Sequence, residues 1–169
     1  MTARGWVSIL SVALGVGCAQ PSYHQGVYRD DSLAFRLEPP GGTWRRIELE
    51  GTALALRDDE AQATLAMQGR CGKDGDDVPL EALTHHLFLQ FESRVLVSSS
   101  ELMLDGRAAL RTELDAKLDG VPKEFVVTVL KKDGCVYDFM LVAAPGGRAL
   151  IAPAYDRWVA SFHTLGAGQ

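Results

Sequence analysis

The chain has 169 residues, of which 47% are hydrophobic and 23% are charged, and its net charge is −5. This length suits a single globular domain after removal of a short export segment, and the composition is that of an ordinary folded protein. The mildly acidic charge excludes the concentrated basic surface that nucleic-acid binding requires. It also offers no electrostatic attraction to anionic lipids.

The first 17 residues have the layout of a secretory signal peptide. Arg4 precedes an apolar run from Trp6 to Val16, which ends in small residues. This order of charged, apolar and small segments is typical of export signals. The run covers about 11 residues, whereas a membrane-spanning helix needs about 20. Residues 1–17 are therefore predicted to be cleaved, not retained as an anchor.

Cys18 follows this segment directly, and the preceding small residues resemble the lipobox of bacterial lipoproteins. Val16 and Gly17 match the two positions before the cysteine, whereas the leucine of the family pattern stands one place early, at Leu14. The resemblance implies cleavage by signal peptidase II and attachment of diacylglycerol and a fatty acid such as palmitate to Cys18. It places the protein in the bacterial cell envelope, with the outer membrane facing the periplasm as the expected site. The alternative is an ordinary secretory signal cleaved near Cys18.

Two cysteines remain when Cys18 carries lipid, and Cys71 and Cys135 then allow only one pairing. Exported proteins meet an oxidising compartment, so we expect a Cys71–Cys135 disulfide. Metal binding by this pair is the alternative, but neither cysteine has a Cys or His partner at zinc-finger spacing.

Residues 18–32 contain no sustained apolar period and are predicted to form a flexible tether. A single folded domain is expected over residues 33–165. It begins with segments in which apolar and polar residues alternate, as in half-buried strands. In the second of them, Ile47 and Leu49 are expected to point inward. The four segments cover residues 33–38, 44–50, 53–57 and 61–68.

Two segments have helical spacing instead. Pro79 suits the first turn of a helix, and apolar residues recur on one side after it. We predict an amphipathic helix of about four turns, lying on a sheet. The second helix follows Pro145-Gly146-Gly147. The apolar positions are Leu80, Leu83, Leu87 and Phe91 in the first helix, and Ile151, Tyr155, Trp158, Val159 and Phe162 in the second.

Four further strands are expected between these helices. Asp105-Gly106, Asp119-Gly120 and Asp133-Gly134 predict hairpin turns that separate them. The last two segments are apolar on both faces, as central strands covered on two sides are. The four cover residues 95–104, 107–118, 125–130 and 136–142.

The element order is therefore ββββαββββα. Short links between strands indicate antiparallel neighbours, and two helices are available to cover the strands that are apolar on both faces. The predicted fold is α+β, with one antiparallel β-sheet of about seven to eight strands flanked by two helices. This order, with the closing segment YDRWVASF, resembles the PsbP-like superfamily over residues 31–165. That superfamily includes photosystem subunits, a nuclear-import cofactor and bacterial lipoproteins, and the resemblance supplies no catalytic motif.

The histidines and serines give weak signals for a catalytic or metal site. His85 lies one turn after Glu81, but His85 and His86 point about 100° apart on a helix and the HExxH pattern is absent. A solvated helix face is the favoured interpretation. Ser98-Ser99-Ser100 has no G-x-S-x-G context, so a serine nucleophile is not expected.

Two other features have structural interpretations. The stretches Gly69–Gly75 and Lys73–Asp77 lack the spacing of a phosphate loop and a calcium loop, and indicate a polar connection. Trp44, Trp158 and Phe162 offer a ligand pocket as one interpretation, but aromatic residues at this spacing more often form core.

We therefore expect no enzyme, no cofactor, no metal and no nucleic-acid partner. The expected function is binding of an unidentified envelope protein, while the lipid anchor holds the domain at the membrane. The exposed faces around the glycine-rich stretch 69–75 and around the hairpins are the expected contact regions. The alternative is a carrier or sensor of a small apolar ligand held between sheet and helix. An envelope enzyme without a recognisable motif is the third possibility.

Overall fold

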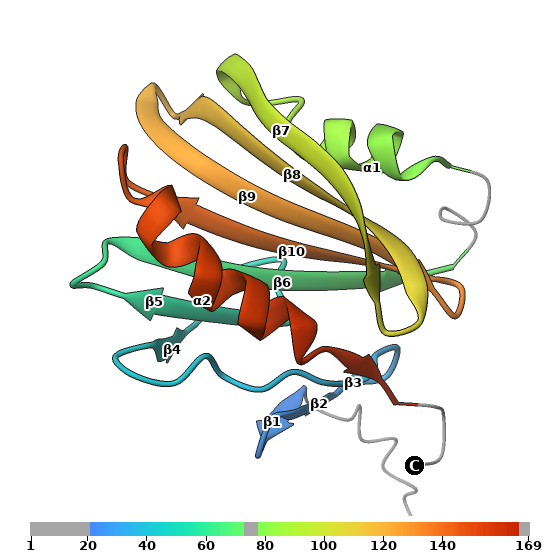
Figure 1. Ribbon diagram of the computed structural model, residues 1–169. Coiled ribbons are helices and arrows are strands. Elements are labelled where there is room, and N and C mark those ends of the chain that lie inside the picture. The colour runs from blue at the N-terminus through green and yellow to red at the C-terminus, as the bar shows by residue number, and fades with distance from the viewer. Residues whose placement is uncertain (1–20, 73–77, 166–169) are drawn as a thin grey trace, which may run out of the picture.

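The computed structural model describes residues 21–72 and 78–165. They form an α+β domain in which two helices flank antiparallel strands (Figure 1). The larger sheet has seven strands in the order β4-β5-β6-β10-β9-β8-β7, and the smaller has the order β1-β2-β3-β11. The larger sheet consists of β4 (Arg45–Ile47), β5 (Leu54–Asp58), β6 (Ala63–Cys71), β10 (Cys135–Ala143), β9 (Val121–Lys132), β8 (Arg107–Leu118) and β7 (Glu92–Leu104). The smaller consists of β1 (Ser22–His24), β2 (Val27–Arg29), β3 (Ala34–Arg36) and β11 (His163–Thr164).

The predicted fold class is confirmed, but the prediction of one sheet is wrong. Leu33, Phe35 and Leu37 are buried, as their alternation predicts. Of these residues only Phe35 lies within β3, and this strand pairs with β2 and with the C-terminal β11 instead of joining the larger sheet. The alternation of apolar residues along a strand indicates which residues are buried. Which strand it pairs with depends on segments far away in the sequence.

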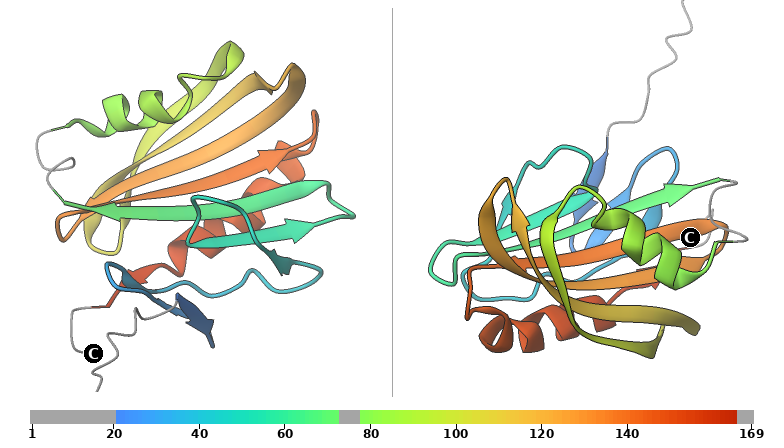
Figure 2. Two further views of the ribbon diagram at one scale, coloured as in Figure 1. Left: turned by 180° about the vertical axis from the view of Figure 1, so that it is seen from behind. Right: turned by 90° about the horizontal axis from the view of Figure 1, so that it is seen from above.

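The helices lie on opposite faces of the larger sheet (Figure 2). Helix α1 (Leu80–Leu87) packs on β8 and β9, and helix α2 (Arg148–Ala160) packs on β9 and β10. Alternate residues of β9 face opposite ways, so Val126 and Leu130 pack with α2, whereas Phe125 and Val127 pack with α1. The prediction that this strand is covered on both faces is confirmed.

The prediction of a tether over residues 18–32 is wrong for residues 22–29. These residues form the β1–β2 hairpin, and the buried Tyr28 ring stacks on Phe35 with centroids 4.8 Å apart. The turn residues Gln25 and Gly26 have φ values of 50° and 76°, the geometry of a tight hairpin turn. Strands of three residues are too short to show the alternation of apolar and polar residues that identifies a strand. The polar composition of this segment therefore favours a linker.

Leu33 and Gly69 connect the two sheets. A Cβ atom placed on Gly69 of β6 would lie 2.8 Å from a methyl group of Leu33. Any larger residue at this position would displace the buried leucine that precedes β3, because that side chain lies directly on the backbone of β6. The sequence interpretation of Gly69 as part of a loop is corrected accordingly.

Helix α1 is shorter than the predicted four turns, since it ends at Leu87 after eight residues. The next residue, Phe88, packs with Phe91 and Phe125 at centroid distances of 5.4 and 6.1 Å. This aromatic cluster packs the connection between the end of α1 and the start of β7. The expectation that Leu49 points inward is also wrong, because its strand ends at Ile47 and the Leu49 side chain is 46% exposed.

The Cys71–Cys135 disulfide is confirmed. The two cysteines are opposite each other in the pairing of β6 with β10, and their Cα atoms are 4.0 Å apart, well below the limit of about 7 Å for a bridge. The two sulfur atoms are bonded to each other. Neither is then a free thiolate, so metal binding by this pair is excluded.

Candidate functional site

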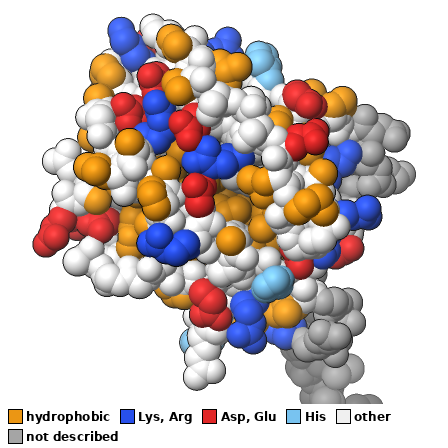
Figure 3. All heavy atoms as spheres, viewed as in Figure 1, with side chains coloured by type: hydrophobic (Ala, Val, Ile, Leu, Met, Phe, Trp, Pro, Cys, Tyr) orange, Lys and Arg blue, Asp and Glu red, His pale blue; other side chains and the backbone are white. Residues whose placement is uncertain are grey.

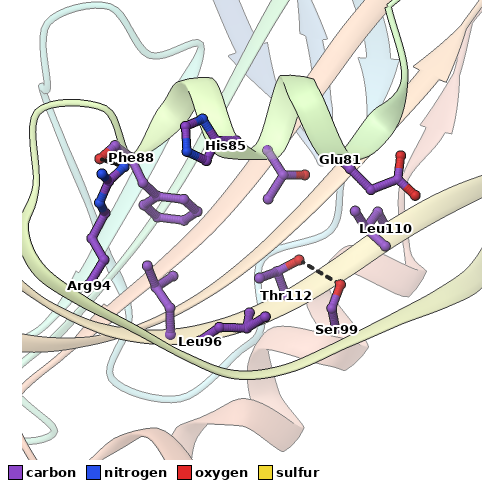
Figure 4. Close-up of a pocket in the computed structure, with 10 residues that line it drawn as sticks. Glu81, His85, Phe88, Arg94, Leu96, Ser99, Leu110 and Thr112 are labelled. Carbon is purple, nitrogen blue, oxygen red and sulfur yellow. Dashed lines mark hydrogen bonds between the residues drawn. The ribbon is translucent and has the colours of Figure 1, made fainter.

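A groove runs between α1 and the last two strands of the larger sheet, β8 and β7 (Figure 4). Its volume is about 390 Å³, within the range of sites that hold small molecules or peptide side chains. Three elements line it. The lining residues are Glu81, Thr84, His85 and Phe88 from α1 and its C-cap, Arg94, Leu96 and Ser99 from β7, and Leu110, Thr112 and Leu114 from β8.

The groove exists because α1 is short and lies over β8 and β9, leaving β7 uncovered. Leu114 of β8 is buried beneath the helix, whereas Leu96, its partner on β7, is 66% exposed. In Figure 4 the Leu96 side chain points toward the ring of Phe88. The groove therefore has an apolar floor and an open side along β7.

Ser99, Thr112 and Thr84 of the groove are hydrogen-bonded locally, and the charged Arg94 and Glu81 lie toward its two ends. Ser99 and Thr112 share a hydrogen bond of 3.3 Å across the two strands. The Thr84 hydroxyl donates to a carbonyl one turn earlier in α1, and Arg94 Nη1 donates to the carbonyl oxygen of Phe88 at 3.1 Å. Glu81 lies toward the other end (Figure 4). This arrangement is suited to receiving apolar groups, with charged groups available for orientation.

The opposite face of β8 is used differently, because ion pairs attach α2 to it. Arg111 contacts Asp156 of α2 at 2.9 Å, and Arg148 of α2 contacts Glu113 at 3.4 Å. Figure 3 shows acidic and basic side chains interleaved over the middle of this face. Hydrogen bonds from Arg111 to Asp156 and Glu113 raise its pKa against the effect of burial. This face therefore serves the internal packing of the domain.

The buried Asp138 and the partly buried Asp105 have shifted pKa values with local structural causes. Burial raises the pKa of Asp138 on β10, although the Arg70 guanidinium and Gln68 beside it act in the opposite direction. For Asp105, burial opposes ionisation, but hydrogen bonds from Lys132 and Thr164 outweigh it and hold the pKa well below its usual range. Neither carboxyl lines the groove.

The structure separates the residues that the sequence singles out. His85 and His86 are exposed on α1, as interpreted, and Ser98 to Ser100 lie along the exposed β7. Within residues 21–72 and 78–165, no group of three or more His, Cys, Asp or Glu side chains is placed to hold a metal ion. Trp158 and Phe162 are core residues and Trp44 packs against that core, which confirms the core interpretation.

Two predicted features lie outside the described residues. They are Cys18, with the signal peptide before it, and the segment 73–77 of the glycine-rich stretch. The described part of that stretch, from Gly69 to Cys71, is the end of β6. The expected contact region around residues 69–75 therefore stays a prediction.

Sequence reasoning missed the groove residues of β7, Arg94 and Leu96. The segment 95–104 is correctly predicted as a strand, but its apolar residues do not alternate as those of β8 do. All residues from Glu92 to Glu101 are exposed. A strand sequence with neither alternating apolar residues, as in burial on one face, nor continuous apolar residues, as in burial on both, indicates an uncovered edge strand.

Solved structures share this architecture at low sequence identity. Cyanobacterial PsbP (CyanoP) from Synechocystis sp. PCC 6803 is 14% identical, with a TM-score of 0.55, and the match covers 92% of this chain and 97% of that one. The fold is PsbP-like. LpqN, involved in cell envelope biogenesis of Mycobacterium tuberculosis, also has a similar structure (14% identity, TM-score 0.55, 86% and 90% covered). A protein of unknown function from Pseudomonas aeruginosa also matches (11% identity, TM-score 0.53, 90% and 100% covered).

At these identities the PsbP-like similarity shows the fold alone. No family model matches the chain, and no curated protein matches it. Neither helix in the described part of the chain is long and apolar enough to cross a membrane.

Proposed function

We propose that this protein is a lipid-anchored protein of the bacterial cell envelope that works by binding, and that the groove between α1 and β7 receives apolar side chains of a protein partner. The observation that carries this proposal is the open apolar groove, in which the exposed Leu96 faces the buried Phe88. Apolar surface of this kind marks interaction sites. The charged Glu81 and Arg94 at the ends would orient the partner.

The position of the groove relative to the anchor supports a protein partner. Cys18 precedes the first residue of β1, Ser22, by four positions, which span at most about 14 Å of extended chain. A lipid on Cys18 would therefore hold the smaller sheet close to the membrane. Helix α1 and the start of β7 lie at the opposite end of the domain from β1 (Figures 1 and 2). The groove would then face away from the lipid and toward other envelope proteins.

Confinement by the anchor strengthens this argument. A lipid anchor raises the effective concentration of the domain for proteins at the same membrane. A groove of about 390 Å³ can then suffice for a weak but specific contact.

Photocrosslinking in intact cells tests the proposal. A photoreactive amino acid at Leu96 of the full-length chain should give a discrete crosslink to a different protein, distinct from a crosslinked dimer of this chain, whereas one at Leu150, an 83% exposed leucine on α2, should not. Ser99→Trp fills the groove and should abolish the product. Ser100→Trp is the matched control, since this neighbour points to the other face of β7. Identical products from Leu96 and Leu150 would contradict the proposal.

A carrier or sensor of a small apolar ligand is the second candidate, and the volume of the groove favours it. The same variants distinguish the two functions. Titration of the purified protein with a fluorescent fatty acid should give saturable binding only if the groove is a carrier site. That binding would be lost in Ser99→Trp and kept in Ser100→Trp.

The proposal contains no catalytic step. Ester, peptide and glycoside substrates test this point on the wild-type protein. Turnover that disappears on substitution of one acidic or histidine residue, with the fold intact, would show that the domain is an enzyme.

A further inference from the structure

Strand β7 is an unusually open edge of the larger sheet. It has 13 residues, about 43 Å of strand, and no strand within residues 21–72 and 78–165 pairs with its outer side. The opposite edge, β4, has three residues, two of which are Arg45 and Arg46. Short and charged edges prevent unwanted pairing, whereas a long apolar edge is a template for another strand.

The side chains of β7 strengthen this contrast. Val95, Leu96 and Val97 are 58%, 66% and 48% exposed, and Met103 is 71% exposed. The only charged residues of the strand are Glu92, Arg94 and Glu101. An exposed apolar run with free main-chain groups on one side is expected to be covered by an extended segment.

The charges of β7 identify the segment that fits. We propose that β7 pairs antiparallel with β7 of a second copy of this chain, with Arg94 of each copy opposite Glu101 of the other. Arg94 and Glu101 share the α1 face, since Arg94 lines the groove and Glu101 pairs with Leu110. Arg94 uses one N–H on the Phe88 carbonyl, so further donors remain for a carboxylate.

The irregularity in β7 makes this register geometrically consistent. The pairing with β8 shifts by one residue between Leu96 and Ser98, so Val97 is an extra residue of the strand. A two-fold axis through this point places Leu96 opposite Ser99 of the second copy on the α1 face, and Val95 opposite Ser100 on the other face. The two Val97 residues then lie beside the axis. Such an interface is self-complementary, as two-fold dimers require.

This dimer goes beyond the proposed function, because it concerns the main-chain edge of β7, although Arg94 and Leu96 also line the groove. It would join the two larger sheets into one continuous sheet. Both copies of α1 would cover the same face of that sheet, so the two grooves would lie side by side across the axis.

Charge exchange tests the register. The full-length protein in detergent should sediment as a dimer whose population depends on concentration. Arg94→Glu alone places two glutamates opposite each other at both ends of the interface, and Glu101→Arg alone places two arginines there. Each variant should raise the dimer Kd about tenfold or more, because like charges opposite each other are strongly unfavourable. An equimolar mixture of the two variants restores opposite charges at both positions and should dimerise like the wild type.

Failure of the mixture to dimerise would overturn the proposal, as would a wild-type protein that is monomeric at every concentration. A second measurement uses disulfide crosslinking in cells. Val97→Cys should give a covalent dimer on a non-reducing gel. Val121→Cys, at a 52% exposed valine away from β7, should remain monomeric. Equal dimer from both variants would also overturn the proposal.

Discussion

Asp138 and Arg70 form an asymmetric ion pair between β10 and β6. The Asp138 side chain is 2% exposed, whereas that of Arg70 is 40% exposed. One carboxylate oxygen of Asp138 accepts hydrogen bonds from Arg70 and Gln68, and the other has no partner within the described part of the chain. Burial therefore raises the pKa of Asp138 despite the nearby guanidinium.

This asymmetry predicts unequal effects of removing each partner. Arg70→Met leaves a buried carboxylate without its counter-charge, so the free energy of unfolding at pH 7 should fall by about 3 kcal/mol. Asp138→Asn leaves an arginine that reaches water, and the loss should be smaller, about 1 kcal/mol. Urea denaturation of both variants measures these values.

The pH dependence of this effect has a defined sign. A carboxyl group whose folded pKa is raised favours the folded state when protonated and opposes it when ionised. The deficit of Arg70→Met should therefore shrink as the pH falls and Asp138 takes up a proton. A deficit that is constant with pH would contradict the role assigned to this pair.

At the level of elements, Asp105 ties the β7–β8 hairpin to the smaller sheet. Its carboxylate accepts hydrogen bonds from the amide and the hydroxyl of Thr164 in β11. It also forms an ion pair with Lys132 of β9 at 2.8 Å. One turn residue therefore joins two sheets that share no strand pairing, and Asp133 adds a second contact by accepting a hydrogen bond from the Thr164 hydroxyl at 3.1 Å.

Asp105→Asn should lower the free energy of unfolding by about 2 kcal/mol at pH 7, because hydrogen bonds to a charged group are lost. Asparagine tolerates the φ of 48° at this position, so the turn itself should persist. The pKa of Asp105 is depressed in the folded state, so its contribution is present above the unfolded pKa of about 4 and is lost as the pH falls. The difference between variant and wild type should therefore decrease at pH 3.

The control for this measurement is Asp119→Asn. Asp119 is an exposed residue in a turn of the same kind, with a φ of 51°. A loss of stability equal to that of Asp105→Asn would assign the effect to the turn and not to the contacts with β11 and β9.

The disulfide acts on the pairing of β6 with β10. Its cysteines are 64 positions apart, and closing a loop of this length in the unfolded chain is worth about 4 kcal/mol. The double variant Cys71→Ser, Cys135→Ser should lose about this amount in urea denaturation. A reductant should bring the wild type to the level of the double variant and leave the double variant unchanged. A reductant effect on the double variant would exclude this explanation.

At the scale of the whole molecule, the lipid anchor predicted at Cys18 would hold the domain at a membrane. Cells grown with labelled palmitate should incorporate the label into the wild-type protein but not into Cys18→Ser, because the lipobox resemblance makes this cysteine the acceptor. Firm attachment to the membrane needs more than one acyl chain. Cys18→Ser would carry none on this residue, so it should move from the membrane fraction to the soluble fraction. Equal labelling of both proteins would contradict the lipoprotein prediction.

Local sequence patterns were sufficient for most elements of the fold. The Asp-Gly pairs at 105–106, 119–120 and 133–134 all adopt positive φ values, because aspartate and glycine tolerate the backbone that a tight hairpin requires. The continuous apolar run in β9 correctly predicted burial on both faces. These signals act over a few residues, so they can be recognised without knowing the rest of the chain.

The α+β class, the hairpins, the second helix and the cysteine pair could be predicted from the residues alone, since each depends on local backbone preference or on there being one possible cysteine pairing. Two features emerged only on folding: Leu33 packs on Gly69 between the two sheets, and α1 ends early enough to leave β7 uncovered. Both outcomes depend on how distant segments compete for the same apolar surface. For that reason the groove and the open edge, on which the proposed functions rest, became visible only in the folded chain.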